Sequence, residues 1–300
     1  MKTTVIHHSA DFDGIFCREI ARKFLPEAEL IGWDHGDPKI PFPAEGTVYI
    51  LDLSPDCLGG DTYDSSRIIW IDHHKSSIEK WPSSIPGYRI DGVAACRLAW
   101  QWFANVGGPV NRAEGQHGYH LPDMEAFRNR QVEEPVAVML AGEYDIWDKR
   151  DERAETFQFG LRSQELSEAD WFILLTGDGP SEHFVERLLA QGGMLQRYQQ
   201  RNDANVVNFR SFLQPFDGLT FLALNTARCN SLSFAAKDVP ETGHDALMGF
   251  YWTGKSWKVS LYHARHRTDL DLSKIAVKFG GGGHRGACGF ECKGALPFCL

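Results

Sequence analysis

Cys-x-x-Cys pairs are missing from this sequence, although it contains seven cysteines: Cys17, Cys57, Cys96, Cys229, Cys288, Cys292 and Cys299. A zinc site built from thiolates needs pairs such as Cys-x-x-Cys, so we expect no such site here. Seven is also an odd number, and scattered cysteines are typical of reduced thiols in the cytosol rather than of a disulfide framework. The sequence therefore predicts a cytoplasmic protein.

Long apolar runs and an excess of positive charge are also missing. No run approaches the ~18 to 20 apolar residues that cross a bilayer. The chain passes from Met1-Lys2 directly into the apolar segment 3–6, which leaves no room for a signal peptide, so we expect no membrane association.

Lys and Arg number 31 against 40 Asp and Glu, a net charge of -9. This balance argues against a protein that coats long duplex DNA, but it is compatible with a small phosphorylated substrate.

The apolar pattern of the first half predicts a mostly parallel sheet. Strand-like segments at 3–6, 30–33, 47–51 and 67–71 alternate with helices or long connections, and this alternation is typical of α/β proteins. Helices are expected at 15–24, where Pro26 ends the helix, and at 93–103 and 135–141. Residues 107–123 carry four glycines and two prolines, which predicts a loop. Ser167 resembles the start of a capping box.

The pattern of predicted helices and strands in the second half differs from that of the first half. Residues 182–213 predict one or two amphipathic helices, broken or kinked near Gly192-Gly193. Strand-like segments follow at 219–224, 246–252 and 257–262, with a hairpin turn at 253–256 and a helix at 272–278. Three hundred residues suit two domains better than one. We expect an α/β protein with an N-terminal mostly parallel-sheet domain (1–180), a helical linker (181–215) and a smaller C-terminal α/β domain (216–300), with the active site in the cleft between the domains.

Histidine and aspartate gather where the predicted strands of the first half end. His7 begins a His-x-x-x-Asp-x-Asp pattern, Asp52 follows the third strand, and Asp72-His73-His74 follows the fourth. In parallel sheets, ligands bind beyond the carboxyl ends of the strands, so these side chains should face one crevice. Carboxylate and imidazole together suit Mn, Fe, Co or Zn. The residues that would hold two such ions, with one carboxylate as a bridge, are His7, Asp11, Asp13, Asp52, His73 and Asp145.

Two alternatives stay open for this cluster. An aspartate at a strand end often serves as a helix cap or turn residue, and Asp148 competes with the nearby Asp145 for the same ligand role. We expect His8 either to support the ligands or to be structural.

Four consecutive glycines, followed by His284-Arg285, stand near the C-terminus. Such a run lets backbone amides approach an anion closely, and His284 and Arg285 would add charge and hydrogen bonds. The alternative is a flexible loop. Arg265 lies in a local basic segment, 263–267, which would either steer a phosphate chain or form a solvated hairpin end.

These motifs resemble those of the DHH phosphoesterase superfamily. The resemblance rests on Asp72-His73-His74 with His7, Asp11, Asp13 and Asp52, and on Gly281-Gly282-Gly283-His284, which is similar to the signature of the DHH-associated C-terminal domain. The sequence departs from the family in having Ser9-Ala10 where many members have a proline, and in its long loop at 107–123.

The resemblance implies roles for individual residues. His7, Asp11 and Asp52 would hold one Mn²⁺-type ion, and Asp13, Asp52, His73 and Asp145 the other, with Mg²⁺ or Co²⁺ as alternatives. Asp72 would orient the neighbouring imidazoles, and His74 would face the scissile phosphate. The remaining substrate contacts would come from Arg265, Gly281, Gly282, Gly283 and His284.

The function implied is a metal-dependent phosphohydrolase that trims short single-stranded oligonucleotides or dinucleotides. A phosphomonoesterase acting on nucleoside bisphosphates, or an exopolyphosphatase or pyrophosphatase, would need the same metals without base contacts. Tyr262, Trp252 and Trp257 are candidates for base stacking or for core packing. A nucleotide-binding module without activity is a further alternative, but clustered carboxylates repel one another when no metal is bound. RNA against DNA, the polarity of cleavage and the oligomeric state stay open.

Overall fold

The computed structural model describes residues 2–60, 64–107, 122–148, 150–227 and 229–298. Contacts within the chain divide it into two units, Met1–Leu195 and Gln196–Leu300. Most of the loop predicted at 107–123 lies outside the described residues. None of the described helices combines the length and apolarity that crossing a bilayer requires.

The first unit is built on a four-stranded sheet in the order β2-β1-β4-β6. Its strands are β1 (Thr3–His8), β2 (Glu29–Trp33), β4 (Thr47–Leu51) and β6 (Ile68–Ile71), and all of its pairings are parallel, as predicted. β1 is longer than expected, because His7 and His8 still pair with Gly32 and Trp33 of β2. A two-stranded sheet of β3 (Ile40–Pro41) and β5 (Leu58–Gly59) and two 3-10 turns, Pro55–Cys57 and Ser65–Arg67, complete this region.

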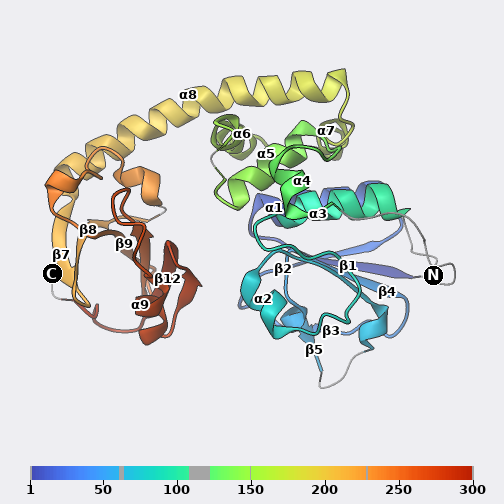
Figure 1. The fold of residues 1–300 in the computed structure, drawn as a ribbon, viewed down its shortest axis with the longest axis horizontal. Coiled ribbons are helices and arrows are strands. Elements are labelled where there is room, and N and C mark those ends of the chain that lie inside the picture. The colour runs from blue at the N-terminus through green and yellow to red at the C-terminus, as the bar shows by residue number, and fades with distance from the viewer. Residues whose placement is uncertain (1, 61–63, 108–121, 149, 228, 299–300) are drawn as a thin grey trace. The chain divides into compact units, whose positions relative to one another are not determined.

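Helices cover one face of this sheet (Figure 1). They are α1 (Phe12–Phe24), α3 (Ala95–Gln101) and α5 (Val136–Asp145). Alternate strand residues such as Val5 and Tyr49 pack with Phe16 in a core on this side, while Ile6 and Trp70 belong to a separate core. That second core also includes Leu58 of β5 and is bordered by Trp81, the residue after α2 (Lys75–Lys80). A buried strand flanked on both faces explains the continuous apolar runs of the sequence.

The remaining helices of this region are α4 (Met124–Arg128), α6 (Arg153–Arg162), α7 (Glu168–Leu174) and the long α8 (Gly179–Arg210), together with a π-helix at Trp102–Gly107. The capping box at Ser167 is confirmed, with Asp170 as its second member. The expected break at Gly192-Gly193 is wrong, because α8 continues through it. A Cβ atom at Gly192 would lie 2.0 Å from the carbonyl oxygen of Thr156 in α6. This glycine therefore permits close helix packing.

The second unit contains a six-stranded sheet in the order β11-β12-β10-β9-β8-β7. Its strands are β7 (Phe212–Phe216), β8 (Leu219–Asn225), β9 (Ala246–Trp252), β10 (Trp257–His263), β11 (Gly282–His284) and β12 (Ala287–Cys292). Only β8 and β9 pair in parallel among these described strands. The predicted hairpin turn is confirmed, since the Thr253 amide donates to the Ser256 carbonyl at 2.9 Å. α9 (Ser273–Lys278) packs on this sheet, with Ile275 in a core that includes Phe221 and Met248. Two 3-10 turns, Ser231–Phe234 and Pro240–Thr242, lie between β8 and β9.

Candidate metal centre

The carboxyl ends of three adjacent parallel strands bring polar side chains to one edge of the first sheet. His8 ends β1, Asp52 follows β4 and Asp72 follows β6. Asp52 has a φ of 58° and its amide donates to the Ile71 carbonyl at 2.9 Å. A left-handed backbone at a non-glycine residue costs about 1–3 kcal/mol and is concentrated at functional sites. The fold thus holds the Asp52 carboxylate in one place at the expense of local strain.

The beginning of α1 contributes two more carboxylates. Asp11 is the N-cap and accepts a hydrogen bond from the Gly14 amide at 3.0 Å. Asp13 is buried in the first turn, where it accepts the amides of Ala95 and Cys96 at 2.8 and 2.7 Å. These amides belong to the first turn of α3, where N–H groups have no carbonyl partner within the helix. Asp13 therefore has a structural role in addition to any ligand role.

A first group of possible ligands consists of His8, Asp11 and Asp52. His8 Nδ1 lies 2.9 Å from Asp11 Oδ2 and 3.4 Å from Asp52 Oδ2. Burial lowers the pKa of His8, but its interactions with Asp11 and Asp52 outweigh burial and raise it to about 11. Asp34, which the sequence did not suggest, lies 3.3 Å from His8 Nε2.

The predicted ligand His7 does not join this group. Its Nδ1 donates to the carbonyl of His8 at 2.8 Å, and burial lowers its pKa. Neighbouring residues of a strand point to opposite faces, so only one of His7 and His8 can face Asp11 and Asp52. The structure brings His8 there. The predicted strand ends at residue 6, so nothing in the sequence indicated that β1 continues through both histidines.

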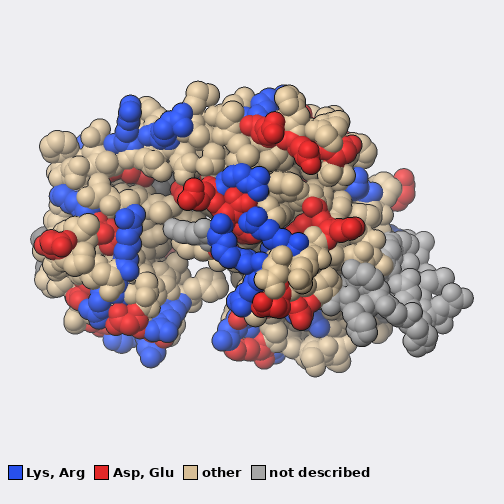
Figure 2. Space-filling model, turned by 45° about the horizontal axis from the view of Figure 1, so that its top comes forward, with Lys and Arg blue, Asp and Glu red and all other residues tan. Residues whose placement is uncertain are grey.

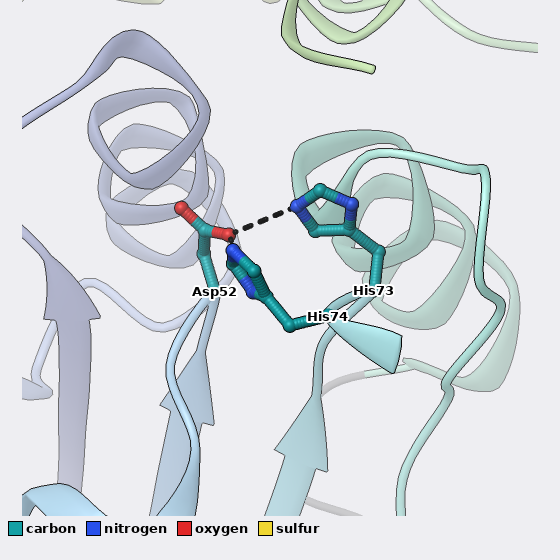
Figure 3. A group of neighbouring side chains, drawn as sticks. All are labelled: Asp52, His73 and His74. Carbon is teal, nitrogen blue, oxygen red and sulfur yellow. Dashed lines mark ion pairs between the residues drawn. The ribbon is translucent and has the colours of Figure 1, made fainter. Parts of the chain in front are cut away.

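A second group consists of Asp13, His73 and Asp145. His73 Nε2 lies 3.6 Å from Asp13 Oδ2, 3.3 Å from Asp145 Oδ2 and 3.4 Å from Asp52 Oδ1. The two groups therefore meet at Asp52, whose carboxylate points toward His73 and His74 in Figure 3. Asp145 is the last residue of α5.

Asp148, the rival of Asp145, faces elsewhere. It forms an ion pair with Arg150, and its Oδ2 accepts a hydrogen bond from Arg150 Nε at 2.6 Å. Burial raises the pKa of Asp148, but the bonds with Arg150 outweigh burial and hold it below its usual value. The geometry thus favours Asp145 as the side chain that accompanies His73.

The electrostatics of the cluster suit a cation. Asp52 is 2% exposed, and neither of its carboxylate oxygens has a hydrogen-bond partner in the described part of the chain. Burial, and next the charge of Asp13, raise the pKa values of both Asp52 and Asp145 well above the usual range. Buried carboxylates without donors are costly unless a cation or proton lies between them. A donor set of carboxylates and imidazoles fits a divalent ion of the Mn²⁺ type.

Asp72 fixes the two histidines that follow it. Its Oδ1 accepts the amides of His73 and His74 at 2.7 and 3.2 Å and lies 2.7 Å from His74 Nδ1. Burial lowers the pKa of His74, but the hydrogen bond with Asp72 outweighs burial and raises it. The His74 side chain is 39% exposed, and its Nδ1 lies 3.9 Å from Asp52 Oδ1. A partly exposed, proton-holding imidazole thus borders the cluster.

The predicted anion-binding run of the second unit forms part of a β-hairpin rather than a flexible loop. Gly282 and His284 pair with Gly289 and Ala287 of β12. Gly283 has a φ of 127°, a conformation that favours glycine, and its missing Cβ would lie 2.7 Å from Cys288 Cα. A Cβ at Gly282 would meet nothing within 4 Å. Gly283 is therefore explained by packing, whereas Gly282 and the exposed His284 are open to a ligand.

The two arginines of this region are used differently. Arg285 donates from its guanidinium to the backbone carbonyls of Leu270 and Asp269, which ties the hairpin to the segment before α9. The side chain of Arg265 is 61% exposed, with Nε 3.8 Å from Asp238 Oδ2. Arg265 is the more accessible of the two for an anion.

Two of the three candidate aromatic residues, Trp252 and Trp257, lie away from these groups, whereas Tyr262 pairs with Ala287, the residue that also pairs with His284. Trp252 pairs with Trp257 at the end of the β9–β10 hairpin opposite His263. At about 3.3 Å per residue, the length of β10 separates these ends by about 20 Å. The Tyr262 hydroxyl donates a hydrogen bond to the Cys229 carbonyl at 2.8 Å, so this group holds two segments of the second unit together.

Comparisons with known proteins place the fold. No protein-family model matches the sequence. The chain is 24% identical over 252 residues to an uncharacterised protein of Acanthamoeba polyphaga mimivirus, in a match that covers 78% of this chain and 50% of that protein. The chain thus spans about half the length of this curated relative.

Solved structures are similar over nearly the whole chain. The DHH domain of a protein described as a member of a ribosomal-protein family matches with a TM-score of 0.53 and 14% identity, covering 96% of this chain and 82% of its own. The pGpG-specific phosphodiesterase PggH of Vibrio cholerae has a TM-score of 0.46 at 14% identity and covers 98% of this chain and 94% of its own. RecJ of Thermus thermophilus in complex with Mn²⁺ has a TM-score of 0.47 at 14% identity, over 96% of this chain and 49% of that one. At such identities the likeness concerns the fold alone. The DHH domain, with a TM-score above 0.5, is the structure that shows this likeness.

Proposed function

We propose that this chain, which has the fold of a DHH domain, is a metal-dependent phosphoesterase of the DHH superfamily. The observation that carries the proposal is the meeting of two Asp/His groups at Asp52, a buried carboxylate that makes no hydrogen bond among the described residues and has His8 Nδ1 and His73 Nε2 each 3.4 Å away. A binding module without activity has no need for such a cluster, since it lowers stability whenever no cation is present.

The ligand sets follow from the two groups. His8, Asp11 and Asp52 hold one divalent ion, and Asp13, Asp52, His73 and Asp145 hold the second, with Asp52 as the bridge. We propose Mn²⁺ for both. When bound, a pair of such ions lowers the pKa of a water molecule and stabilises negative charge on a phosphoryl oxygen. The role given to His7 by the sequence passes to His8 in this proposal.

His74 and Asp72 act on the substrate side of the cluster. Asp72 accepts a hydrogen bond from His74 Nδ1–H and favours the protonated ring. We expect the remaining N–H of His74 to donate to a phosphoryl oxygen and to favour the charge that develops there. Asp72 is therefore a positioning residue and His74 a catalytic one.

The substrates proposed are short single-stranded oligonucleotides or dinucleotides. On the face shown in Figure 2, Lys and Arg side chains gather in a cluster near the middle, and Asp and Glu side chains border this cluster. This arrangement supports a short ligand rather than a long duplex. We propose that Arg265, His284 and the amides of Gly282 and Gly283 bind the phosphate that is not cleaved. The Gly281 amide donates instead to the Ala276 carbonyl at 2.9 Å.

A second candidate is a phosphomonoesterase or polyphosphate hydrolase. It is favoured by the position of Trp252 and Trp257, which lie at the opposite end of the β9–β10 hairpin from His263 and so do not stack a base beside His284. The two candidates share the same metal centre. They differ in whether a nucleobase contributes to binding.

A turnover panel with added Mn²⁺ tests both candidates. The substrates are short RNA and DNA oligomers, linear and cyclic dinucleotides, nucleoside bisphosphates, pyrophosphate and polyphosphate. Highest kcat/KM on di- to tetranucleotides supports the proposal, whereas highest kcat/KM on bisphosphates or polyphosphate supports the second candidate. No turnover of any phosphorylated substrate with Mn²⁺, Mg²⁺ or Co²⁺ would refute both.

A matched pair of variants, His8→Ala and His7→Ala, tests which of the two histidines is the metal ligand. His8→Ala should weaken Mn²⁺ binding and lower turnover by at least ~10²-fold, about 2.7 kcal/mol in transition-state stabilisation, because a ligand is lost. His7→Ala should leave the number of bound Mn²⁺ ions unchanged, although the buried ring contributes to stability. Mn²⁺ titrations of both variants decide between the histidines, and loss of an ion only in His7→Ala would return the role to His7.

A further inference from the structure

A second cluster of possible metal ligands lies in the other unit, outside the centre described above. Asp238, His244 and His266 each offer one donor atom, and these atoms all lie within 4.8 Å of one another. Asp238 and His244 flank the 3-10 turn Pro240–Thr242, and His266 follows β10. Both Asp238 and His244 are buried, at 4% and 3% exposure, while His266 is exposed.

The hydrogen bond of His266 prepares one of its nitrogens for an ion. Its Nε2 lies 2.9 Å from the backbone carbonyl of His244. A carbonyl oxygen only accepts, so Nε2 carries the hydrogen, and in the neutral ring Nδ1 keeps its lone pair. Histidines that bind metals commonly donate their second N–H to a carbonyl or carboxylate in this way. His266 is therefore held in a tautomer that can coordinate an ion.

His244 is buried with part of its bonding capacity unused. Its Nε2 lies 3.1 Å from Asp238 Oδ1, whereas its Nδ1 has no hydrogen-bond partner among the residues that the structure describes. Leaving a buried polar atom unpaired costs about 1–3 kcal/mol. A structural His–Asp pair alone does not explain why a third ligand, His266, stands beside it with its ring 5.1 Å away.

We propose that Asp238, His244 and His266 bind one divalent transition-metal ion, with Zn²⁺ or Co²⁺ as the preferred class. Two imidazoles and one carboxylate form the donor set that such ions favour over Mg²⁺ or Ca²⁺. The ion would take the place of the hydrogen between His244 Nε2 and Asp238 Oδ1, whose separation of 3.1 Å is close to the about 3.3 Å between ligand atoms on a tetrahedral ion with bonds of about 2.0 Å. His244 would then carry its hydrogen on Nδ1, the nitrogen without a partner among the described residues. Three protein ligands leave a fourth position for water.

The surroundings of Asp238 leave room for the ion. Its two oxygens accept the backbone amide of Arg265 at 3.3 and 3.2 Å, and this amide can stay in place when an ion binds. The Arg265 guanidinium, 3.8 Å from Oδ2, is the competing cation. Its side chain is 61% exposed and is free to turn into solvent. An ion at Asp238 would thus release the Arg265 side chain while fixing the backbone around it.

Cobalt binding to the full chain tests the proposal independently of the proposed enzymatic activity. Asp52→Ala serves as the background, because it disables the bridge of the other centre. We expect this chain to bind Co²⁺ with visible ligand-field bands of low-coordinate cobalt, and we expect His266→Gln in the same background to remove one bound ion per chain by equilibrium dialysis. His266 is exposed, so the variant should keep its thermal unfolding temperature without metal.

The matched control is His183→Gln, since the side chain of His183 is 85% exposed on α8. It should leave the Co²⁺ stoichiometry and the bands unchanged. Asp238→Asn should reproduce the loss seen with His266→Gln. Equal Co²⁺ stoichiometry with and without His266→Gln would overturn the proposal and leave Asp238 and His244 as a structural pair.

Discussion

Replacing Asp145 by asparagine should have two effects of opposite sign. Asp145 Oδ2 lies 3.3 Å from His73 Nε2, and its donor atom lies within 4.8 Å of that of Asp13. Burial and the charge of Asp13 raise the pKa of Asp145, so the carboxylate destabilises the metal-free fold while serving as a ligand when an ion is present. Asp145→Asn should therefore raise the melting temperature of the metal-free protein and weaken Mn²⁺ binding.

The size of the first effect follows from the geometry. Two unit charges at the 4.8 Å limit of this separation repel by about 3.5 kcal/mol at an effective dielectric constant of about 20. A protonated His73, which lies closer at 3.3 Å, would offset this repulsion completely. We therefore expect the gain of the asparagine variant, about 1 kcal/mol, at a pH where an ordinary imidazole is neutral. For a unit of this size, such a gain corresponds to a rise in Tm of about 2–4 °C.

The gain should also depend on pH. A carboxyl group whose pKa is raised in the folded state reduces stability at every pH above its unfolded pKa, and the penalty disappears when the group is protonated in both states. The advantage of Asp145→Asn should therefore be full at the highest pH tested, shrink as the pH falls through the raised folded pKa, and vanish below about pH 4. Calorimetry in the presence of a chelator measures it.

The second effect is measured by titration with Mn²⁺. Loss of one carboxylate ligand should weaken the second ion by about 10- to 100-fold, which corresponds to about 1.4–2.7 kcal/mol. Asp148→Asn is the matched control, because Asp148 pairs with Arg150 instead of His73. It should leave Mn²⁺ affinity unchanged and lower Tm slightly, since partly exposed ion pairs contribute about 0.2–1 kcal/mol. The reverse ranking of the two variants in Mn²⁺ affinity would transfer the ligand role to Asp148.

Three further predictions concern the proposed activity. Asp52→Ala should abolish Mn²⁺-dependent hydrolysis with an unchanged circular dichroism spectrum. Asp13→Ala should abolish the hydrolysis and also lower Tm, because Asp13 accepts hydrogen bonds from two amides of α3. Substantial activity in both variants would exclude the two-ion centre. Asp72→Asn should move the alkaline limb of the pH–rate profile to lower pH, since Asp72 raises the pKa of His74, and an unmoved limb would contradict this role. His284→Ala should cut the rate on oligonucleotides by ~10²-fold, about 2.7 kcal/mol, and hydrolysis of bis-p-nitrophenyl phosphate much less; equal losses would show that His284 serves the fold or the metal centre.

The strands of the first unit and the residues that follow them were readable from the sequence. β4 has the bounds that its apolar run predicts, and Asp52 and Asp72 stand directly after β4 and β6. Both features are local, because a buried parallel strand must be apolar throughout and its polar successor marks the edge of the sheet. The parallel arrangement itself followed from the alternation of strands and helices.

The role of each glycine depended on tertiary contacts. The sequence pattern at Gly192 is that of a helix break, yet α8 continues through it, and α6 lies too close to this position for a Cβ atom. Gly283 is likewise explained by close packing, because its missing Cβ would lie 2.7 Å from Cys288 Cα in β12. A glycine that permits a turn and a glycine that permits close packing have the same letter in a sequence, and only the neighbouring chain distinguishes them.

Tertiary structure decided which of the candidate ligands lie together. His7 and His8 are adjacent in the sequence, and the end of β1 turns His8 toward Asp11 and Asp52. Asp145 and Asp148 are three residues apart, and the end of α5 places one at His73 and leaves the other with Arg150. The cluster of Asp238, His244 and His266 has no sequence motif, because its members come from a turn and from the end of a distant strand. Local patterns determine where strands and helices form, but side-chain direction and long-range pairing determine which donor atoms meet.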